Sequence, residues 1–102
     1  MTIENREHPR APFRVEIVLE CASGKRQARV SDISVGGCFV ETILDLNVGD
    51  EVKFELVHPN GGRLPFVGAV AYHFVGQGFG VKFSGLTDDQ KEFLERITRD
   101  AT

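Results

Sequence analysis

Apolar and polar residues alternate along several short stretches of the chain, and turn-forming residues separate these stretches. In residues 13–20 every second position is apolar and most positions between are charged: Phe13, Val15, Ile17 and Leu19 alternate with Arg14, Glu16, Val18 and Glu20. Such an alternation predicts a β-strand with one buried face. Similar alternation or β-favouring composition predicts further strands at 27–31, 38–41, 51–58, 64–75 and 79–83.

The segments between the predicted strands are rich in glycine, asparagine and proline. The run Pro59-Asn60-Gly61-Gly62 is typical of a β-hairpin turn, and a loop is expected at 32–37. Six short strands joined by such turns predict an all-β domain, a six-stranded antiparallel β-barrel, because closing the sheet removes its exposed edges. In the strand at 64–75, the residues expected on the inward side are Phe66, Gly68, Val70 and Tyr72.

The two ends of the chain differ from this pattern. Pro9 and Pro12 exclude a regular helix at 1–12, so we expect a flexible, extended arm there and the barrel with its helix at 13–102. Near the other end, Thr87 and Gln90 have the spacing of a helix capping box. The short C-terminal helix that follows has one apolar face, formed by Phe93, Leu94 and Ile97.

Length and composition indicate one ordinary globular domain of 102 residues, 41% of them hydrophobic and 26% charged. No apolar run approaches the ~20 residues that a membrane helix needs, and residues 1–10 lack the apolar stretch of a secretory signal. We therefore expect a cytoplasmic protein in which Cys21 and Cys38 are reduced thiols. The three histidines are scattered, so we expect no metal site.

The charge is unevenly distributed along the chain. The net charge is −3, but the part up to Ser31 carries six basic and four acidic residues, whereas the remainder carries six basic and eleven acidic ones. A small basic excess on an acidic protein indicates a local site for a small anion. A protein that binds long DNA or RNA would need a broader basic surface.

Two short motifs could carry binding chemistry. Arg6 and Arg10 lie four residues apart on the predicted arm, and guanidinium groups bind phosphates and the edge of guanine. In the predicted loop, Asp32 offers a carboxylate to the N–H groups of guanine, Ser34 can donate or accept, and the pair Gly36–Gly37 permits close approach of a ligand. Taken separately, the arginines are also consistent with a solvated terminus and the loop with an ordinary turn.

Together these motifs resemble the signature of the PilZ domain family. Arg-x-x-x-Arg at Arg6 and Arg10 is followed by Asp-x-Ser-x-x-Gly at Asp32, Ser34 and Gly37, and the runs 38–40 and 78–83 are also similar to the family pattern. The resemblance implies a six-stranded barrel with a C-terminal helix and cyclic di-GMP as the ligand, with no further cofactor.

The resemblance also implies roles for individual residues. Arg6 and Arg10 would hold phosphates and guanine edges, Asp32 and Ser34 would bond to a guanine on the barrel surface, and Gly37 would leave room for it. An aromatic residue is common in the family where Tyr72 falls, which places Tyr72 near the ligand, although it also fits the inward pattern of its strand.

Three functions follow as hypotheses. The first is a cyclic di-GMP receptor whose arm becomes ordered on binding and which signals to a protein partner controlling motility, pili, biofilm or exopolysaccharide. The second is a nucleotide-independent interaction module in pilus or motility assembly. The third, an enzyme such as a nucleotide hydrolase, has no nucleophile–base pair to support it, so we expect no catalysis.

Overall fold

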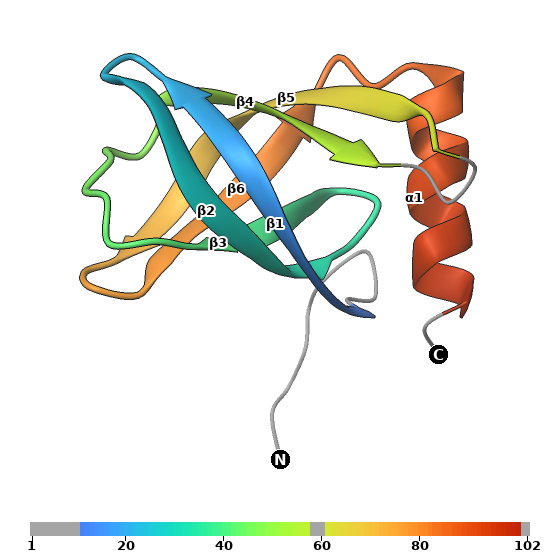
Figure 1. Cartoon of the computed structure of the whole chain (residues 1–102), viewed down its shortest axis with the longest axis horizontal. Helices are drawn as coiled ribbons and strands as arrows, with labels where there is room; N and C mark the ends of the chain where they lie inside the picture. Colours follow the sequence, from blue (N-terminus) through green and yellow to red (C-terminus); the bar gives the residue numbers. More distant parts are fainter. Residues whose placement is uncertain (1–10, 58–60, 101–102) are drawn as a thin grey trace.

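A computed structural model describes residues 11–57 and 61–100 and shows strands followed by one helix (Figure 1). In chain order these are β1 (Ala11–Cys21), β2 (Gly24–Ile33), β3 (Gly37–Glu41), β4 (Glu51–Val57), β5 (Arg63–Phe74), β6 (Gly78–Ser84) and α1 (Asp88–Asp100).

The strands form a closed antiparallel barrel in the order β1-β2-β3-β6-β5-β4. This confirms the predicted fold class. Long registers join most neighbouring strands, but β1 meets β4 through a single residue pair, Glu20 and Lys53. The barrel is therefore closed, with a thinly paired seam between β1 and β4.

The barrel interior is filled by the alternating apolar residues of the strands. Val52, Phe54 and Leu56 of β4 are all buried and alternate with exposed residues, as the pattern predicted. Phe66 lies at the centre of an aromatic cluster, with ring centroids 6.0 Å from Phe54 and 5.2 Å from Phe83. One core therefore runs through the barrel.

Helix α1 stands at one end of the barrel, beside the loop between β2 and β3 (Figure 1). Its buried Phe93 and Leu94 cover that end of the core. The predicted capping box is present: the Thr87 N–H donates to Gln90 Oε1 at 2.6 Å, and the Gln90 N–H donates to Thr87 Oγ1 at 3.2 Å. Gln90 Nε2 also donates to the Pro65 carbonyl, which ties the helix to β5.

Strand β2 is longer than predicted, because it includes Asp32 and Ile33 of the expected 32–37 loop. Asp32 pairs with Phe39 and Ile33 pairs with Cys38, so the ladder with β3 continues past Ser31. The register shifts between Val30 and Asp32, which leaves Ser31 as an extra residue. The loop itself is thereby reduced to the residues between Ile33 and Gly37.

The inward position predicted for Tyr72 is wrong, because β5 contains a β-bulge. Phe66, Gly68 and Val70 are buried on the inward side as predicted. The register then shifts: Val70 pairs with Val81, and Tyr72 pairs with Gly80. Ala71 is the extra residue, and one extra residue moves the following side chains to the opposite face of a sheet. Tyr72 therefore lies on the outer face.

Candidate functional site

Four residues form a row across the outer face of the barrel. Asp32 of β2 pairs with Phe39 of β3, Phe39 pairs with Gly80 of β6, and Gly80 pairs with Tyr72 of β5. Buried inward residues flank two of these positions, Cys38 and Val40 around Phe39 in β3, and Phe79 and Val81 around Gly80 in β6. Because side chains alternate along a strand and paired residues share a face, the row faces outward.

Aromatic rings occupy one half of this row. The Tyr72 ring centroid lies 6.2 Å from that of Phe39 and 5.3 Å from that of Phe74. Phe74 is 52% exposed, so part of the cluster faces solvent. The cluster offers flat apolar surface of the kind on which a nucleobase stacks.

Gly80 allows Tyr72 to lie against the barrel wall. A Cβ atom at position 80 would lie 2.3 Å from two atoms of the Tyr72 ring. No side chain larger than hydrogen fits between the ring and β6, so the position of Tyr72 depends on the glycine.

The Ser34 hydroxyl is fully engaged by its own loop. Ser34 Oγ donates to the Gly37 carbonyl at 3.3 Å and accepts from the N–H groups of Gly36 and Gly37, both at 3.2 Å. A hydroxyl has one donor and two acceptor sites, so these bonds use its full capacity. Ser34 is also only 5% exposed. In this structure the hydroxyl stabilises the turn from β2 into β3.

Gly37 lies where two strands approach closely. A Cβ atom there would lie 2.0 Å from the Val81 carbonyl oxygen, so the packing of β3 against β6 itself requires glycine. The neighbouring Gly36 carbonyl accepts a hydrogen bond from the Phe83 N–H at 2.9 Å. Both glycines of the motif thus tie the loop to β6.

Asp32 lies on a strand, at the end of the row nearest to β1. The backbone of Pro12 is its partner in the register between β1 and β2. The chain therefore leaves the predicted arm and enters the barrel beside Asp32. Arg6 and Arg10, the other residues predicted for the site, lie outside the described residues.

The structure thus brings Asp32 and Tyr72 onto one outer row, and it places Ser34 and Gly36 in the adjoining loop and Gly37 at the start of β3. Sequence reasoning missed Phe39, Phe74 and Gly80. The glycines of the 78–83 run were a usable signal, because glycine at an outward strand position marks close approach of another group. Phe39 and Phe74 gave no such signal in the sequence, because their position beside Tyr72 depends on the bulge in β5.

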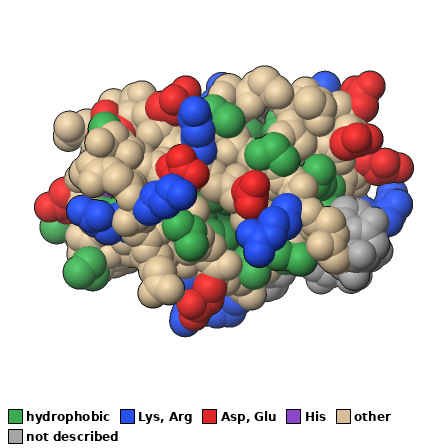
Figure 2. All heavy atoms as spheres, turned by 45° about the horizontal axis from the view of Figure 1, so that its top comes forward, with side chains coloured by type: hydrophobic (Ala, Val, Ile, Leu, Met, Phe, Trp, Pro, Cys, Tyr) green, Lys and Arg blue, Asp and Glu red, His purple; other side chains and the backbone are tan. Residues whose placement is uncertain are grey.

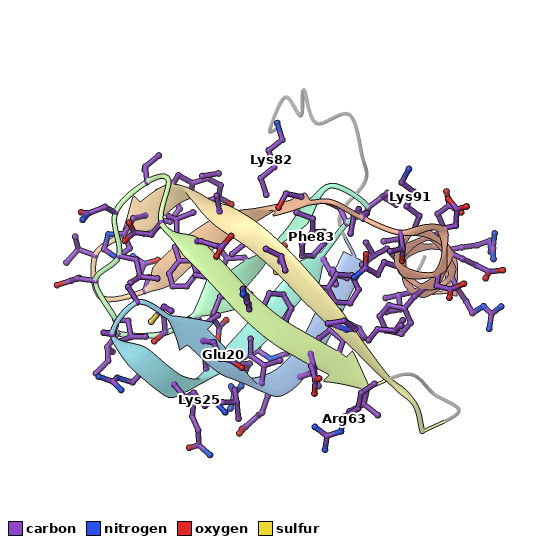
Figure 3. The ribbon with its side chains drawn as sticks, turned by 90° about the horizontal axis from the view of Figure 1, so that it is seen from above. Glu20, Lys25, Arg63, Lys82, Phe83 and Lys91 are labelled. Atoms are coloured by element: carbon purple, nitrogen blue, oxygen red, sulfur yellow. The ribbon has the colours of Figure 1, made fainter. Side chains whose placement is uncertain are left out.

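A separate groove of about 650 Å³ follows the seam between β1 and β4 and contains none of the predicted site residues. Figure 3 shows Lys25 and Arg63, which line it, on the side of the barrel opposite Lys82. In the described ranges 11–57 and 61–100, no group of His, Cys, Asp or Glu side chains could hold a metal ion.

The face drawn in Figure 2 mixes acidic, basic and apolar side chains, and no broad basic area covers it. In the part of the chain that the structure describes, no helix is long and apolar enough to cross a membrane.

The outer face of this small closed barrel carries a carboxylate and aromatic rings beside a glycine loop, groups that a site for a small ligand could use. The chain belongs to the PilZ domain family, whose model matches residues 4–100. No curated protein sequence matches the chain.

Solved structures share the fold at low sequence identity. The PilZ domain of CeSA from a cellulose-synthesizing bacterium is 19% identical, with a TM-score of 0.68 over 90% of this chain and 96% of that one. The PilZ domain of Escherichia coli YcgR, solved with c-di-GMP, is 17% identical, with a TM-score of 0.74 over 96% of this chain and 92% of that one.

The Bacillus subtilis inhibitor of motility, MotI, is 16% identical, with a TM-score of 0.78. The match covers 96% of this chain but only 52% of MotI. These likenesses independently support the barrel and its helix.

Proposed function

We propose that this protein is a cyclic di-GMP receptor that binds its ligand on the outer row of the barrel. The observation that carries the proposal is the row itself, which aligns the Asp32 carboxylate with an aromatic cluster and meets the entry of the N-terminal arm. Membership of the PilZ family and the fold shared with YcgR, solved with c-di-GMP, support the choice of ligand.

In this proposal each part of the site recognises a different part of the ligand. Asp32 accepts hydrogen bonds from the N1–H and N2–H groups of a guanine. The exposed part of the cluster around Tyr72 receives a base by stacking. Arg6 and Arg10 bind the phosphates and guanine edges from the arm, as charge-assisted and bidentate donors.

Ser34 and Gly37 have a supporting role in the proposal. A direct bond from Ser34 Oγ to guanine would require one of its three hydrogen bonds in the loop to be exchanged. We therefore assign to Ser34 and Gly37 the task of holding the loop beside Asp32. This refines the sequence-based expectation that Ser34 bonds directly to the base.

In this proposal, ligand binding changes the surface that the protein presents to a partner. The arm folds over the bound nucleotide next to Asp32, and the entropic cost of ordering it is offset by charge-assisted hydrogen bonds. A protein partner that controls motility, pili, biofilm or exopolysaccharide then recognises the combined surface of arm, ligand and barrel. The protein acts through binding and carries out no catalysis.

Calorimetric titration with cyclic di-GMP tests the proposal and measures the stoichiometry. We expect Arg10→Ala and Asp32→Asn each to weaken binding about tenfold or more, because each removes a charge-assisted hydrogen bond worth about 1.5–3 kcal/mol. Arg26→Ala, in the exposed start of β2, is the matched control and should bind like the wild type. If the wild-type protein did not bind cyclic di-GMP at micromolar concentrations, the receptor function would be contradicted. The second hypothesis, a nucleotide-independent interaction module, would then remain.

A further inference from the structure

Lys82 is the only charged residue of β6 and stands on the outer face of the barrel. It is exposed, and it lies between the buried, inward-facing residues Val81 and Phe83. Alternation along the strand therefore puts Lys82 on the same face as Gly80, which belongs to the outer row. Figure 3 shows Lys82 projecting away from the barrel, on the side opposite Lys25 and Arg63.

The residues that pair with Lys82 carry no charge, and the acidic residue described in its row, Glu51 of β4, lies beyond Ala69. The partners of Lys82 in the neighbouring strands are Gly37 and Ala69, and the next outward residues along β6 are Gly80 and Ser84. Within residues 11–57 and 61–100 no ion pair involves Lys82, whereas Arg14, Arg29 and Arg63 each pair with a glutamate. The ammonium group of Lys82 thus has an uncompensated charge in the described part of the protein.

Small residues separate Lys82 from the outer row. Gly80 lies two positions away along β6, about 7 Å at the usual rise of a strand. Asp32 lies two strands away from β6, about 10 Å across the sheet. Neither Gly37 nor Gly80 has a side chain that would obstruct the flexible lysine stem. The ammonium group can therefore reach over the loop or over the row.

We propose that Lys82 is a further ligand-binding residue and that it holds a phosphate of the bound nucleotide. The inference rests on the proposed function. A guanine held at Asp32 brings its sugar–phosphate ring over Gly37 and Gly80, within reach of Lys82. Lys82 then neutralises one phosphate from the barrel wall, while the arginines act from the arm. The site thus has a cationic group that belongs to the barrel itself.

Titration calorimetry with cyclic di-GMP at low and high NaCl concentration tests this role. Lys82→Gln should weaken binding about three- to tenfold at low salt, the range expected for one partly solvated ion pair. Lys82→Glu should weaken it further, and Lys82→Arg should restore it because the charge is kept. At high salt the difference between the wild type and Lys82→Gln should shrink, because counterions screen exposed charges.

Lys25→Gln is the matched control, since Lys25 is an exposed lysine on the opposite side of the barrel. It should bind like the wild type at both salt concentrations. If Lys82→Gln and Lys82→Glu both bound cyclic di-GMP with wild-type affinity at low salt, the role of Lys82 would be overturned. The receptor function would be unaffected by that result. A wild-type protein that binds no cyclic di-GMP would overturn the receptor function and this inference together.

Discussion

Gly80 of β6 allows the Tyr72 ring, part of the aromatic surface of the candidate site, to pack directly on the strand. The Tyr72 ring lies where the side chain of residue 80 would otherwise be, and this contact aligns it with Phe39 and Phe74. A substitution at position 80 therefore acts on binding through Tyr72 and not through lost contacts of its own.

Gly80→Ala should displace the Tyr72 ring. We expect the free energy of unfolding to fall by about 1–3 kcal/mol, the usual cost of overpacking, and the affinity for cyclic di-GMP to fall as well. Chemical denaturation and calorimetry measure the two effects. Val75→Ala, at a nearby residue that is 80% exposed, should change stability by less than about 0.5 kcal/mol. A Gly80→Ala protein as stable as the wild type would contradict the packing of Tyr72 against β6.

The sequence indicated candidate site residues, but it could not indicate what they contact. Asp32 stands beside the predicted arm, and the Ser34–Gly37 loop adjoins it. The orientation of Tyr72 could not be predicted, because the bulge at Ala71 depends on how β5 pairs with β6. The three hydrogen bonds of Ser34 Oγ likewise arise only once the loop has closed.

At the scale of elements, the loop between β2 and β3 is a short, rigid connection. Ser34 binds backbone groups within the loop, and the N–H of Phe83 fastens Gly36 to β6. Alternation in the sequence predicted the strands, and the capping box predicted the start of α1. The extension of β2 through Asp32 was not predicted, because it depends on pairing with Phe39 around the bulge at Ser31.

Ser34→Ala should loosen this loop. The substitution removes the acceptor of the Gly36 and Gly37 N–H groups, and an unsatisfied buried donor costs about 1–3 kcal/mol. We expect a corresponding loss of stability and faster amide hydrogen exchange at Gly36 and Gly37. Ser84→Ala is a suitable control, because the exposed Ser84 hydroxyl only donates to the Val67 carbonyl at 3.4 Å. Unchanged exchange in Ser34→Ala would show that the hydroxyl does not hold the loop.

At the scale of the whole molecule, the start of β1 lies beside one end of the outer row. Pro12 pairs with Asp32, so the described part of the chain begins beside the proposed ligand site. The closed order of the strands, with β3 next to β6, was expected only in outline, because pairing between distant strands leaves no local pattern in the sequence.

Cyclic di-GMP should protect the arm from trypsin. Trypsin cleaves after Arg6 and Arg10, and in our proposal both side chains are bound to the ligand. We expect cleavage at these two sites to slow about tenfold or more with saturating nucleotide, because local opening then requires loss of the ligand. Mass spectrometry of the N-terminal fragments measures the rates.

Cleavage after Arg99, in the last turn of α1, provides an internal control and should be unaffected by the ligand. Guanosine monophosphate, which cannot supply two bridging phosphates, should protect much less. Equal cleavage after Arg10 with and without cyclic di-GMP, in a protein that binds the nucleotide, would contradict the ordering of the arm.

The seam between β1 and β4 makes the strand pairing of the barrel uneven. Several residue pairs join each neighbouring pair among β2, β3, β6 and β5, the strands that carry the proposed binding face, although bulges interrupt two of these registers. The register between β1 and β4 contains the single pair Glu20 and Lys53. The wall that carries the proposed binding face is therefore more extensively paired than the seam between β1 and β4. In the proposed receptor, such a wall could hold the ligand without distortion of the recognition surface, and strain would be taken up at the seam between β1 and β4.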